Sequence, residues 1–174
     1  GYSFGGRIAI ETAISHPEMV KSLVISNSIL YPTRPTRDSV KAWRTHLEAL
    51  EKGDIETSAN RTTLTAFSSS FMAENPAEVE KYREMASRNE PHGLTRLMRS
   101  LVTPAPLPDL TKIKCPVLLI MGANDPNLSI EQGEKASKEI DGSKLVIFPT
   151  GHATPIEMPD KFNTTVMEFL AGLK

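Results

Sequence analysis

Gly1-Tyr2-Ser3-Phe4-Gly5-Gly6 opens the chain, and a run with apolar residues at helical spacing follows it directly over residues 7–15. The pattern Gly-x-Ser-x-Gly at the start of a helix is typical of a nucleophile elbow, a sharp strand-to-helix turn that exposes a serine hydroxyl at the edge of a sheet. We expect Ser3 to be strained, side chains at positions 1 and 5 to collide across the turn, and Gly6 to let the helix pack close to the sheet. Because an elbow needs a strand running into it, we expect this chain to be the C-terminal part of a longer protein.

Composition and charge limit the class of protein. With 174 residues, of which 39% are hydrophobic, the chain can bury the core of one ordinary domain. The net charge of −1 and the lack of a basic block argue against nucleic acid and anionic membrane surfaces, so we expect a small-molecule partner. The low cysteine content fits a reducing cytosol, so we expect a cytoplasmic location. No apolar run reaches the length of a membrane span. The sequence does not indicate an oligomeric state.

Cysteine and histidine usage argues against disulfides, metals and cofactors. The single cysteine, Cys115, excludes an internal disulfide and fits a reducing compartment. Because it precedes an apolar run, we expect it to be a buried small residue rather than a nucleophile. The chain has no His-Glu-x-x-His, no cysteine pair and no histidine-carboxylate cluster, so we expect neither a metal ion nor another cofactor.

Periodicity and Gly/Pro punctuation predict an α/β core interrupted by helices. The expected strands are residues 22–27, 116–122 and 145–148, and the expected core helices are residues 5–15, 130–140 and 159–170. Residues 31–36 break the pattern, and helices without intervening strands follow over residues 38–52, 76–88 (with Asn75 as cap) and 90–101, with a more ambiguous stretch at 54–72 and a proline-rich linker at 104–108. The sequence therefore predicts a parallel-sheet core from residues 1–30 and 109–174 and an all-helical insertion from 31–108.

Polar loops follow the two later strands, and each carries a residue suited to acid–base chemistry. Asp125 follows the strand at 116–122, and His152 follows the strand at 145–148. A serine hydroxyl needs a base to take its proton, and the base needs a carboxylate to orient it. Since the carboxyl ends of parallel strands meet at one edge of a sheet, we expect Ser3, Asp125 and His152 to come together there.

Other acids and histidines fit structural roles better. Asp109 precedes its strand, and Asp54 lies in the helical insertion, so we expect both to be solvated or to cap helices. Glu157 follows His152 closely and is expected to support that loop through backbone hydrogen bonds. His46 and His92 are expected to be structural or exposed, with contact to a substrate as the alternative.

Three segments together resemble the α/β-hydrolase family, in particular its cap-bearing serine hydrolases: esterases, enol-lactonases, haloperoxidase-like hydrolases and C–C bond hydrolases. They are Gly-Tyr-Ser-Phe-Gly-Gly at 1–6, Pro-Val-Leu-Leu-Ile-Met-Gly-Ala-Asn-Asp-Pro at 116–126, and Gly-His-Ala-Thr-Pro-Ile-Glu-Met-Pro-Asp-Lys-Phe at 151–162. The similarity runs over essentially the whole chain. It implies an α/β-hydrolase core with a helical cap, of which the early strands and an upstream oxyanion loop are not in this chain.

The resemblance also implies roles for particular residues. Ser3 would be the nucleophile, His152 the general base and then acid, Asp125 the orienting acid, and the Phe4 N–H one oxyanion donor. A serine at the elbow argues against the dehalogenase and epoxide-hydrolase branches, whose nucleophile is a carboxylate. We expect Tyr2, Trp43, Phe67 and Phe71 to contact substrate; for the three cap residues, packing between cap helices is the alternative.

These features favour a serine hydrolase that cleaves a small, fairly apolar ester or lactone through an acyl-enzyme. Two alternatives stay open: C–C bond hydrolysis on the same fold, and a non-catalytic ligand-binding protein in which the three residues are vestigial. Since the upstream oxyanion loop is outside the chain, we expect these 174 residues alone to be inactive.

Overall fold

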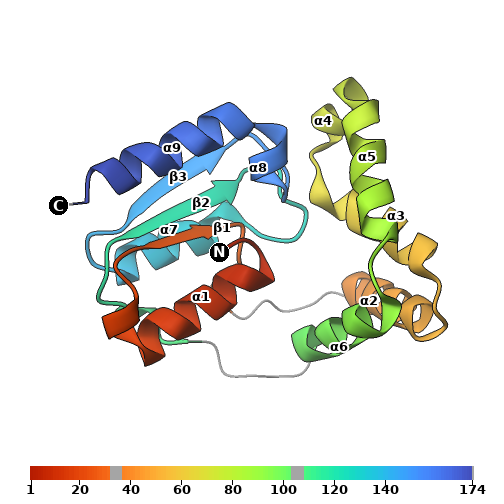
Figure 1. Ribbon diagram of the computed structural model, residues 1–174, viewed down its shortest axis with the longest axis horizontal. Coiled ribbons are helices and arrows are strands. Elements are labelled where there is room, and N and C mark those ends of the chain that lie inside the picture. Colours follow the sequence, from red (N-terminus) through yellow and green to blue (C-terminus); the bar gives the residue numbers. More distant parts are fainter. Residues whose placement is uncertain (32–36, 103–107, 174) are drawn as a thin grey trace. The chain divides into compact units, whose positions relative to one another are not determined.

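The computed structural model describes residues 1–31, 37–102 and 108–173 and divides into two compact units (Figure 1). The first unit consists of Gly1–Pro32, Ala66–Ser69 and Leu107–Lys174, and the second of Thr33–Thr65 and Ser70–Pro106. Most of the predicted break at 31–36 and of the proline-rich linker at 104–108 lies outside the described residues. The sequence did not predict that residues 66–69, in the middle of the helical insertion, pack with the first unit.

Three parallel strands form the sheet of the first unit, as predicted. They are β1 (Leu23–Ser26), β2 (Val117–Gly122) and β3 (Lys144–Phe148), in the order β1-β2-β3. Leu119 of β2 lies opposite Ile25 on one side and Leu145 on the other. Tyr2 forms an isolated parallel bridge with Ser26, so the chain passes alongside the end of β1 before it turns into the elbow.

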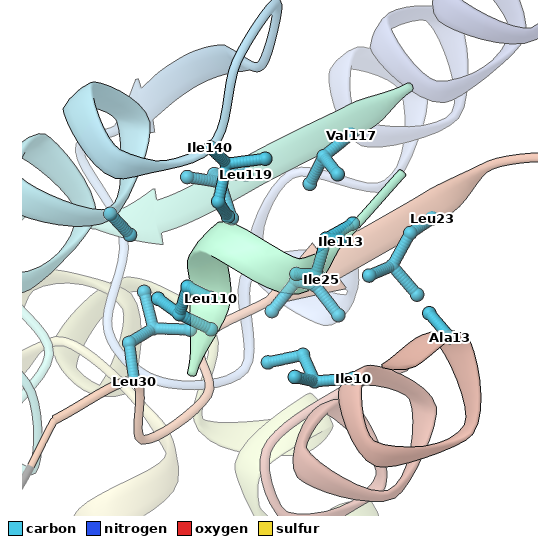
Figure 2. Close-up of a cluster of buried hydrophobic side chains, with 11 residues drawn as sticks. Ile10, Ala13, Leu23, Ile25, Leu30, Leu110, Ile113, Val117, Leu119 and Ile140 are labelled. Atoms are coloured by element: carbon cyan, nitrogen blue, oxygen red, sulfur yellow. The ribbon is translucent and has the colours of Figure 1, made fainter. Parts of the chain in front are cut away.

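Helices cover both faces of this sheet because the central strand β2 is apolar on both. All six residues of β2 are buried, and their side chains alternate between the faces. On one face, Val117 and Leu119 join a cluster that includes Ile10 of α1 (Phe4–Ser15) and Ala136 of α7 (Ile130–Glu139); Figure 2 shows this cluster. On the other face, the side chains that meet are Leu118, Ile120, Phe148 and, from α9 (Pro159–Ala171), Phe169. The unit therefore has three layers, with the sheet in the middle.

Every regular element in the described part of the second unit is a helix. Its helices are α2 (Arg37–Glu51), α3 (Ile55–Ala66), α4 (Ser69–Glu74), α5 (Pro76–Ser87) and α6 (Pro91–Val102). Glu51 at the end of α2 pairs with Arg99 of α6, and Arg83 of α5 pairs with Glu56 of α3. The ambiguous stretch at 54–72 is two helices, α3 and α4, separated at residues 67 and 68.

Asn75 is the cap residue of α5, as predicted, but its side chain makes no hydrogen bond to the helix start. The residue precedes the helix, but its side-chain amide donates to the carbonyl of Phe71, one turn earlier in the chain. Glu78 N–H and Val79 N–H instead bond the Asn75 carbonyl. The helix start is thus stabilised by the backbone and by Pro76, which needs no N–H partner at that position.

Three short helices were not predicted: η1 (Pro17–Met19), η2 (Leu110–Lys112) and α8 (Thr154–Glu157). Asp109 accepts hydrogen bonds from Thr111 at the start of η2, which confirms its expected capping role. In the described ranges, each helix is too short or too polar to span a bilayer.

Candidate active site

The elbow places Ser3 at the tip of a strained turn, as the sequence predicts. Ser3 has φ of 50° and ψ of −122°, a left-handed conformation that is costly for a residue with a Cβ, and its N–H donates to Ser26 O at 2.9 Å. A Cβ at Gly1 would lie 2.4 Å from Gly5 O, and one at Gly6 would lie 2.6 Å from the Cβ of Ser28. The turn and the close approach of α1 therefore both require glycine.

The prediction that a side chain at Gly5 would collide across the turn was wrong. A Cβ at this position would meet no described atom within 4 Å. Gly5 lies in the first turn of α1 and is exposed, so its Cβ would point away from the turn that Gly1 closes. Crowding explains the first glycine of the pattern and not the second.

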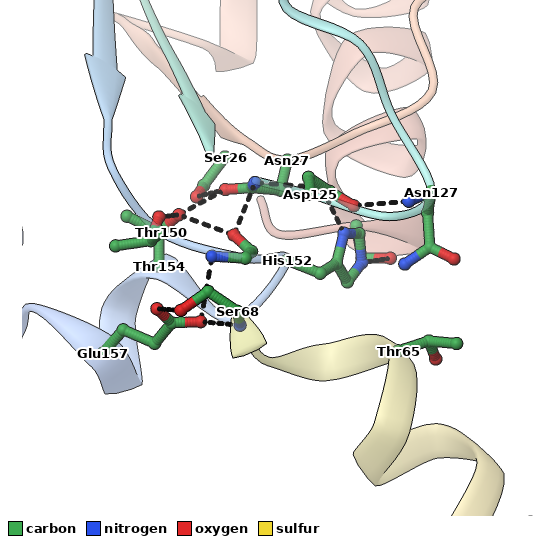
Figure 3. A network of polar contacts seen from close by, with 12 residues as sticks. Ser26, Asn27, Thr65, Ser68, Asp125, Asn127, Thr150, His152, Thr154 and Glu157 are labelled. Carbon is green, nitrogen blue, oxygen red and sulfur yellow. Dashed lines mark hydrogen bonds and ion pairs between the residues drawn. The ribbon is translucent and has the colours of Figure 1, made fainter. Parts of the chain in front are cut away.

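The structure brings Ser3, His152 and Asp125 together at the carboxyl ends of the strands. His152 Nε2 lies 2.8 Å from Ser3 Oγ, and His152 Nδ1 lies 2.7 Å from Asp125 Oδ2 (Figure 3). A carboxylate can only accept, so Nδ1 carries the hydrogen and donates it to Asp125. Nε2 then presents its lone pair to the Ser3 hydroxyl, which is the tautomer that a general base needs.

The Asp125 carboxylate is completely buried and is held by three donors. Its side chain is 0% exposed, compared with 15% for His152. Oδ1 accepts from Asn127 N–H at 2.8 Å, and Oδ2 accepts from Asn27 Nδ2 at 3.1 Å in addition to His152. A buried charge is tolerated only when it is well paired and hydrogen-bonded, and these bonds supply that pairing.

Asn27 is a residue of the site that the sequence analysis missed. Its side chain is buried, and its backbone has φ of 46°, a region that asparagine enters more readily than most residues. Besides donating to Asp125, it approaches Gly151 O at 3.4 Å and accepts from Ser26 Oγ and Thr154 Oγ1 at 3.0 and 2.9 Å. It therefore links the loops after all three strands. The available signal was a polar residue directly after a buried strand, at the same edge as Asp125.

Thr150 and Thr154 extend this network away from the site. Their hydroxyl oxygens lie 2.7 Å apart, and both side chains are buried. Since Thr154 donates its hydrogen to Asn27, Thr150 is the donor to Thr154. Figure 3 shows Thr150 and Thr154 joined to Asn27, on the side of Asn27 away from the imidazole ring. The loop after β3 is thereby bonded to the loop after β1.

Two further elbow residues lie beside these groups. The Tyr2 ring lies 5.2 Å from the His152 ring, centroid to centroid, with the planes tilted by 46°. Phe4 is the first residue of α1, and the first N–H groups of a helix have no acceptor inside the helix. The Phe4 N–H is thus available in principle to a developing oxyanion.

The predicted substrate contacts of the insertion fall in different units. Phe67 is 2% exposed and belongs to the first unit, where it is a packed side chain. Trp43 on α2 and Phe71 on α4 are partly buried in the second unit. Contact with substrate stays a prediction for these three residues and for Tyr2.

The alternative acids and histidines have structural partners. Asp54 accepts from Thr57 N–H at the start of α3, the capping role expected for it. His46 is 7% exposed and bonds Ser58 Oγ through Nε2 at 2.7 Å; burial lowers the pKa of this histidine. His92 is exposed.

Cys115 is partly buried against the first core cluster, and burial raises the pKa of its thiol. A thiol in this environment is a packing residue, in agreement with the sequence. Across the described part of the chain, no group of three or more histidine, cysteine, aspartate or glutamate side chains is arranged to hold a metal ion.

A family model described as the alpha/beta hydrolase family matches residues 1–165. The chain therefore belongs to the alpha/beta hydrolase family. Its architecture agrees with this: the parallel sheet and flanking helices match the enol-lactonase from Burkholderia xenovorans LB400 with a TM-score of 0.86 at 23% identity, over 98% of this chain and 64% of that one.

Two hydrolases of known name resemble the chain in sequence. The chain is 25% identical over 166 residues to 3-oxoadipate enol-lactonase 2 of Acinetobacter baylyi, covering 95% of this chain and 60% of that protein. It is 27% identical over 180 residues to (E)-2-((N-methylformamido)methylene)succinate hydrolase of the same organism, covering 98% of this chain and 63% of the relative. The chain thus spans less than two thirds of the length of these relatives.

Proposed function

We propose that the protein is a serine hydrolase that cleaves a small, fairly apolar ester or lactone through an acyl-enzyme. The observation that carries this proposal is the unbroken hydrogen-bonded series from Ser3 Oγ through the imidazole of His152 to the buried carboxylate of Asp125. The name of the enol-lactonase relative supports lactone or ester chemistry, and the aromatic side chains of the helical insertion support an apolar substrate.

In the proposed acylation, Ser3 Oγ attacks the substrate carbonyl carbon while His152 Nε2 takes the hydroxyl proton. The carbonyl oxygen becomes negative and accepts a hydrogen bond from the Phe4 N–H; enzymes of this fold add a second N–H from a loop after an early strand. The tetrahedral intermediate then collapses. The bond from carbon to the leaving oxygen breaks, and that oxygen takes the proton from Nε2. The acyl group remains on Ser3.

In the proposed deacylation, water replaces the leaving group. His152 Nε2 takes a proton from the water as its oxygen attacks the acyl carbon, and the proton then passes to Ser3 Oγ when the ester bond breaks. Asp125 stays ionised throughout and stabilises the imidazolium, which is favoured by the donors that surround its carboxylate. The products are the free acid and the regenerated serine.

In the test, the full-length product of the gene is treated with a fluorophosphonate probe. Mass spectrometry then locates the adduct. We expect a single adduct on Ser3 that is absent in Ser3→Ala. A folded wild-type protein without this adduct would refute the hydrolase proposal and favour a non-catalytic binding role.

A second assay separates ester cleavage from the C–C alternative. Nitrophenyl esters of short acids and a simple enol-lactone are compared with a dienoic ketone. Turnover of the ketone alone, in a protein that the probe labels, would favour C–C bond hydrolysis.

A further inference from the structure

The carboxylate of Glu157, at the end of α8, is bonded by three neutral donors. Oε1 accepts from Ser68 N–H at 2.7 Å and from Gly151 N–H at 2.9 Å, and Oε2 accepts from Ser68 Oγ at 2.7 Å (Figure 3). Hydrogen bonds to an ionised acceptor are shorter and about twice as strong as neutral ones. Glu157 therefore ties two segments that are far apart in sequence: residues 66–68 and the loop that carries His152.

A second bond ties the same two segments. Ala153 N–H donates to Ala66 O at 2.6 Å. Gly151 and Ala153 are the two neighbours of His152, so the backbone is held immediately before and after the imidazole. Both neighbours are buried, whereas the His152 side chain is partly exposed. The loop is thus fixed at its flanks and leaves the ring free to face Ser3.

The fit between the segments is tight. A Cβ on Gly151 would lie 2.4 Å from Ser68 N and 2.5 Å from the carbonyl carbon of Phe67, so only glycine allows this approach. Residues 149–153 lie between β3 and α8 and belong to neither. No helix or strand ladder fixes them, so their position depends on these bonds together with those that Asn27 and Asn124 make to Gly151 O and Thr150 O.

Glu157 is not an alternative to Asp125 as the orienting acid. Its oxygens are occupied by Ser68 and Gly151, and His152 Nδ1 is bonded to Asp125. The hydrogen bonds of this carboxylate reach the imidazole only through the backbone of the loop. That distinguishes it from groups that touch the reacting atoms.

We propose that Glu157, acting through Ser68, is a positioning residue for the base at His152. This inference rests on the proposed function. The carboxylate clamps residues 66–68 onto the histidine loop and so sets the distance from Nε2 to Ser3 Oγ. A displacement of 1 Å in such a geometry costs about 10²-fold in rate, which is the scale of effect that the clamp controls. Segment 66–69, although it interrupts the helical insertion, is then part of the scaffold of the active site.

The experiment compares Glu157→Gln and Ser68→Ala with wild-type in the protein as its gene encodes it. Glu157→Gln keeps the shape but removes the charge that strengthens these bonds: the amide oxygen still accepts from the two N–H groups, and the Ser68 hydroxyl must turn to accept from the amide nitrogen. We expect it to lower kcat and the rate of fluorophosphonate labelling of Ser3 by about 10- to 100-fold, with KM changed by less than about 3-fold. Ser68→Ala removes one of the three bonds and is expected to lower both rates by about 3- to 10-fold. Glu168→Gln, on the exposed side of α9, is the matched control and is expected to leave both rates unchanged.

A double variant tests whether Glu157 and Ser68 act through the same contact. If Ser68 works through Glu157, the double variant should lose no more than Glu157→Gln alone, within about 2-fold, whereas independent effects would multiply. A purely structural role predicts a lower active fraction, which titration of labelled Ser3 would show, with the rate per labelled site unchanged.

The outcomes separate this inference from the function on which it rests. A wild-type protein that is not labelled on Ser3 overturns both. A labelled wild-type protein together with a folded Glu157→Gln variant of equal rate overturns the clamp and leaves the hydrolase proposal standing. If Glu157→Gln does not fold, Ser68→Ala decides in its place, and an unchanged rate in that variant refutes the clamp.

Discussion

Replacing Asn27 by aspartate changes one contact of the site and leaves the others in place. The variant keeps the size of the side chain, a residue type that tolerates positive φ, and the oxygen that accepts from Ser26 and Thr154. Only the donor Nδ2, 3.1 Å from Asp125 Oδ2 and 3.4 Å from Gly151 O, becomes an acceptor. Asn27→Asp therefore sets a second carboxyl group against a buried carboxylate.

The expected loss of folding stability follows from the proton that the introduced carboxyl group must retain. Two buried carboxyl groups at hydrogen-bonding distance cannot both ionise, so the folded-state pKa of the introduced group rises by roughly 2–3 units above its unfolded value. Each unit corresponds to about 1.4 kcal/mol. Since the folded state holds the extra proton, stability is lost as pH rises: the variant should be destabilised by about 3–4 kcal/mol near pH 8 and far less near pH 4.

Urea unfolding at several pH values between about 5 and 9 measures this difference. Asn163→Asp, on an exposed position of α9, is the matched control and is expected to change the free energy of unfolding by less than about 0.5 kcal/mol at every pH. If the difference between Asn27→Asp and wild-type does not grow with pH, the Asn27 amide does not donate to a buried Asp125 carboxylate and the reasoning is wrong.

Three further predictions concern the site, the helical unit and the elbow. Asp125→Asn should lower kcat by about 10⁴-fold in steady-state assays, because an amide that donates toward Nδ1 reverses the imidazole tautomer; a variant that keeps a tenth of the activity would contradict the proposed role. Burial lowers the pKa of His46, so the unfolded chain binds more protons than the folded one, and the free energy of unfolding should fall as pH drops below 6.5. In urea titrations, His46→Gln should flatten that decline. An unaltered decline would show that His46 is not its source. Gly6→Ala places a Cβ 2.6 Å from Ser28 Cβ and should cost about 1–3 kcal/mol in chemical denaturation, whereas Gly5→Ala has open space and should be neutral or stabilising by up to about 1 kcal/mol; equal effects would contradict the packing of α1.

The strands and most helices could be predicted because their signals are local. Residues 117–122 form an unbroken apolar run, and Pro17 and Gly53 end helical periods within a few residues of the observed ends. The convergence of Ser3, Asp125 and His152 could also be anticipated, since one topological rule places the carboxyl ends of parallel strands at a common edge. These predictions needed only the order of elements along the chain.

The contacts that organise the site depend on residues far apart in sequence, and no local pattern reports them. Asn27 looks like a residue that ends a strand, and its bond to Asp125 exists only once the strands pair. Residues 66–68 look like a gap between two helices, and their bonds to Glu157 and Ala153 in the first unit form only in the folded chain. The role of Glu157 as a loop support was anticipated, but its partner in the helical insertion was not. The prediction that a side chain at Gly5 would collide was wrong for the same reason, because only the folded turn shows which glycine is crowded.

The polar residues around the loop that carries His152 share one property: the direction of each hydrogen bond between them is fixed by the partners. Asn27 donates with its nitrogen and accepts with its oxygen, Thr154 donates to Asn27 and accepts from Thr150, and Glu157 only accepts. In a buried network an atom of the wrong sense leaves two groups opposed, which costs more than a small loss of volume. The isosteric exchange Asn27→Asp should therefore disturb the site more than its unchanged shape implies, and Glu157→Gln should do so by removing the charge that strengthens its three bonds. For this reason the two substitutions that alter the fewest atoms are also the most informative tests of how the imidazole is held.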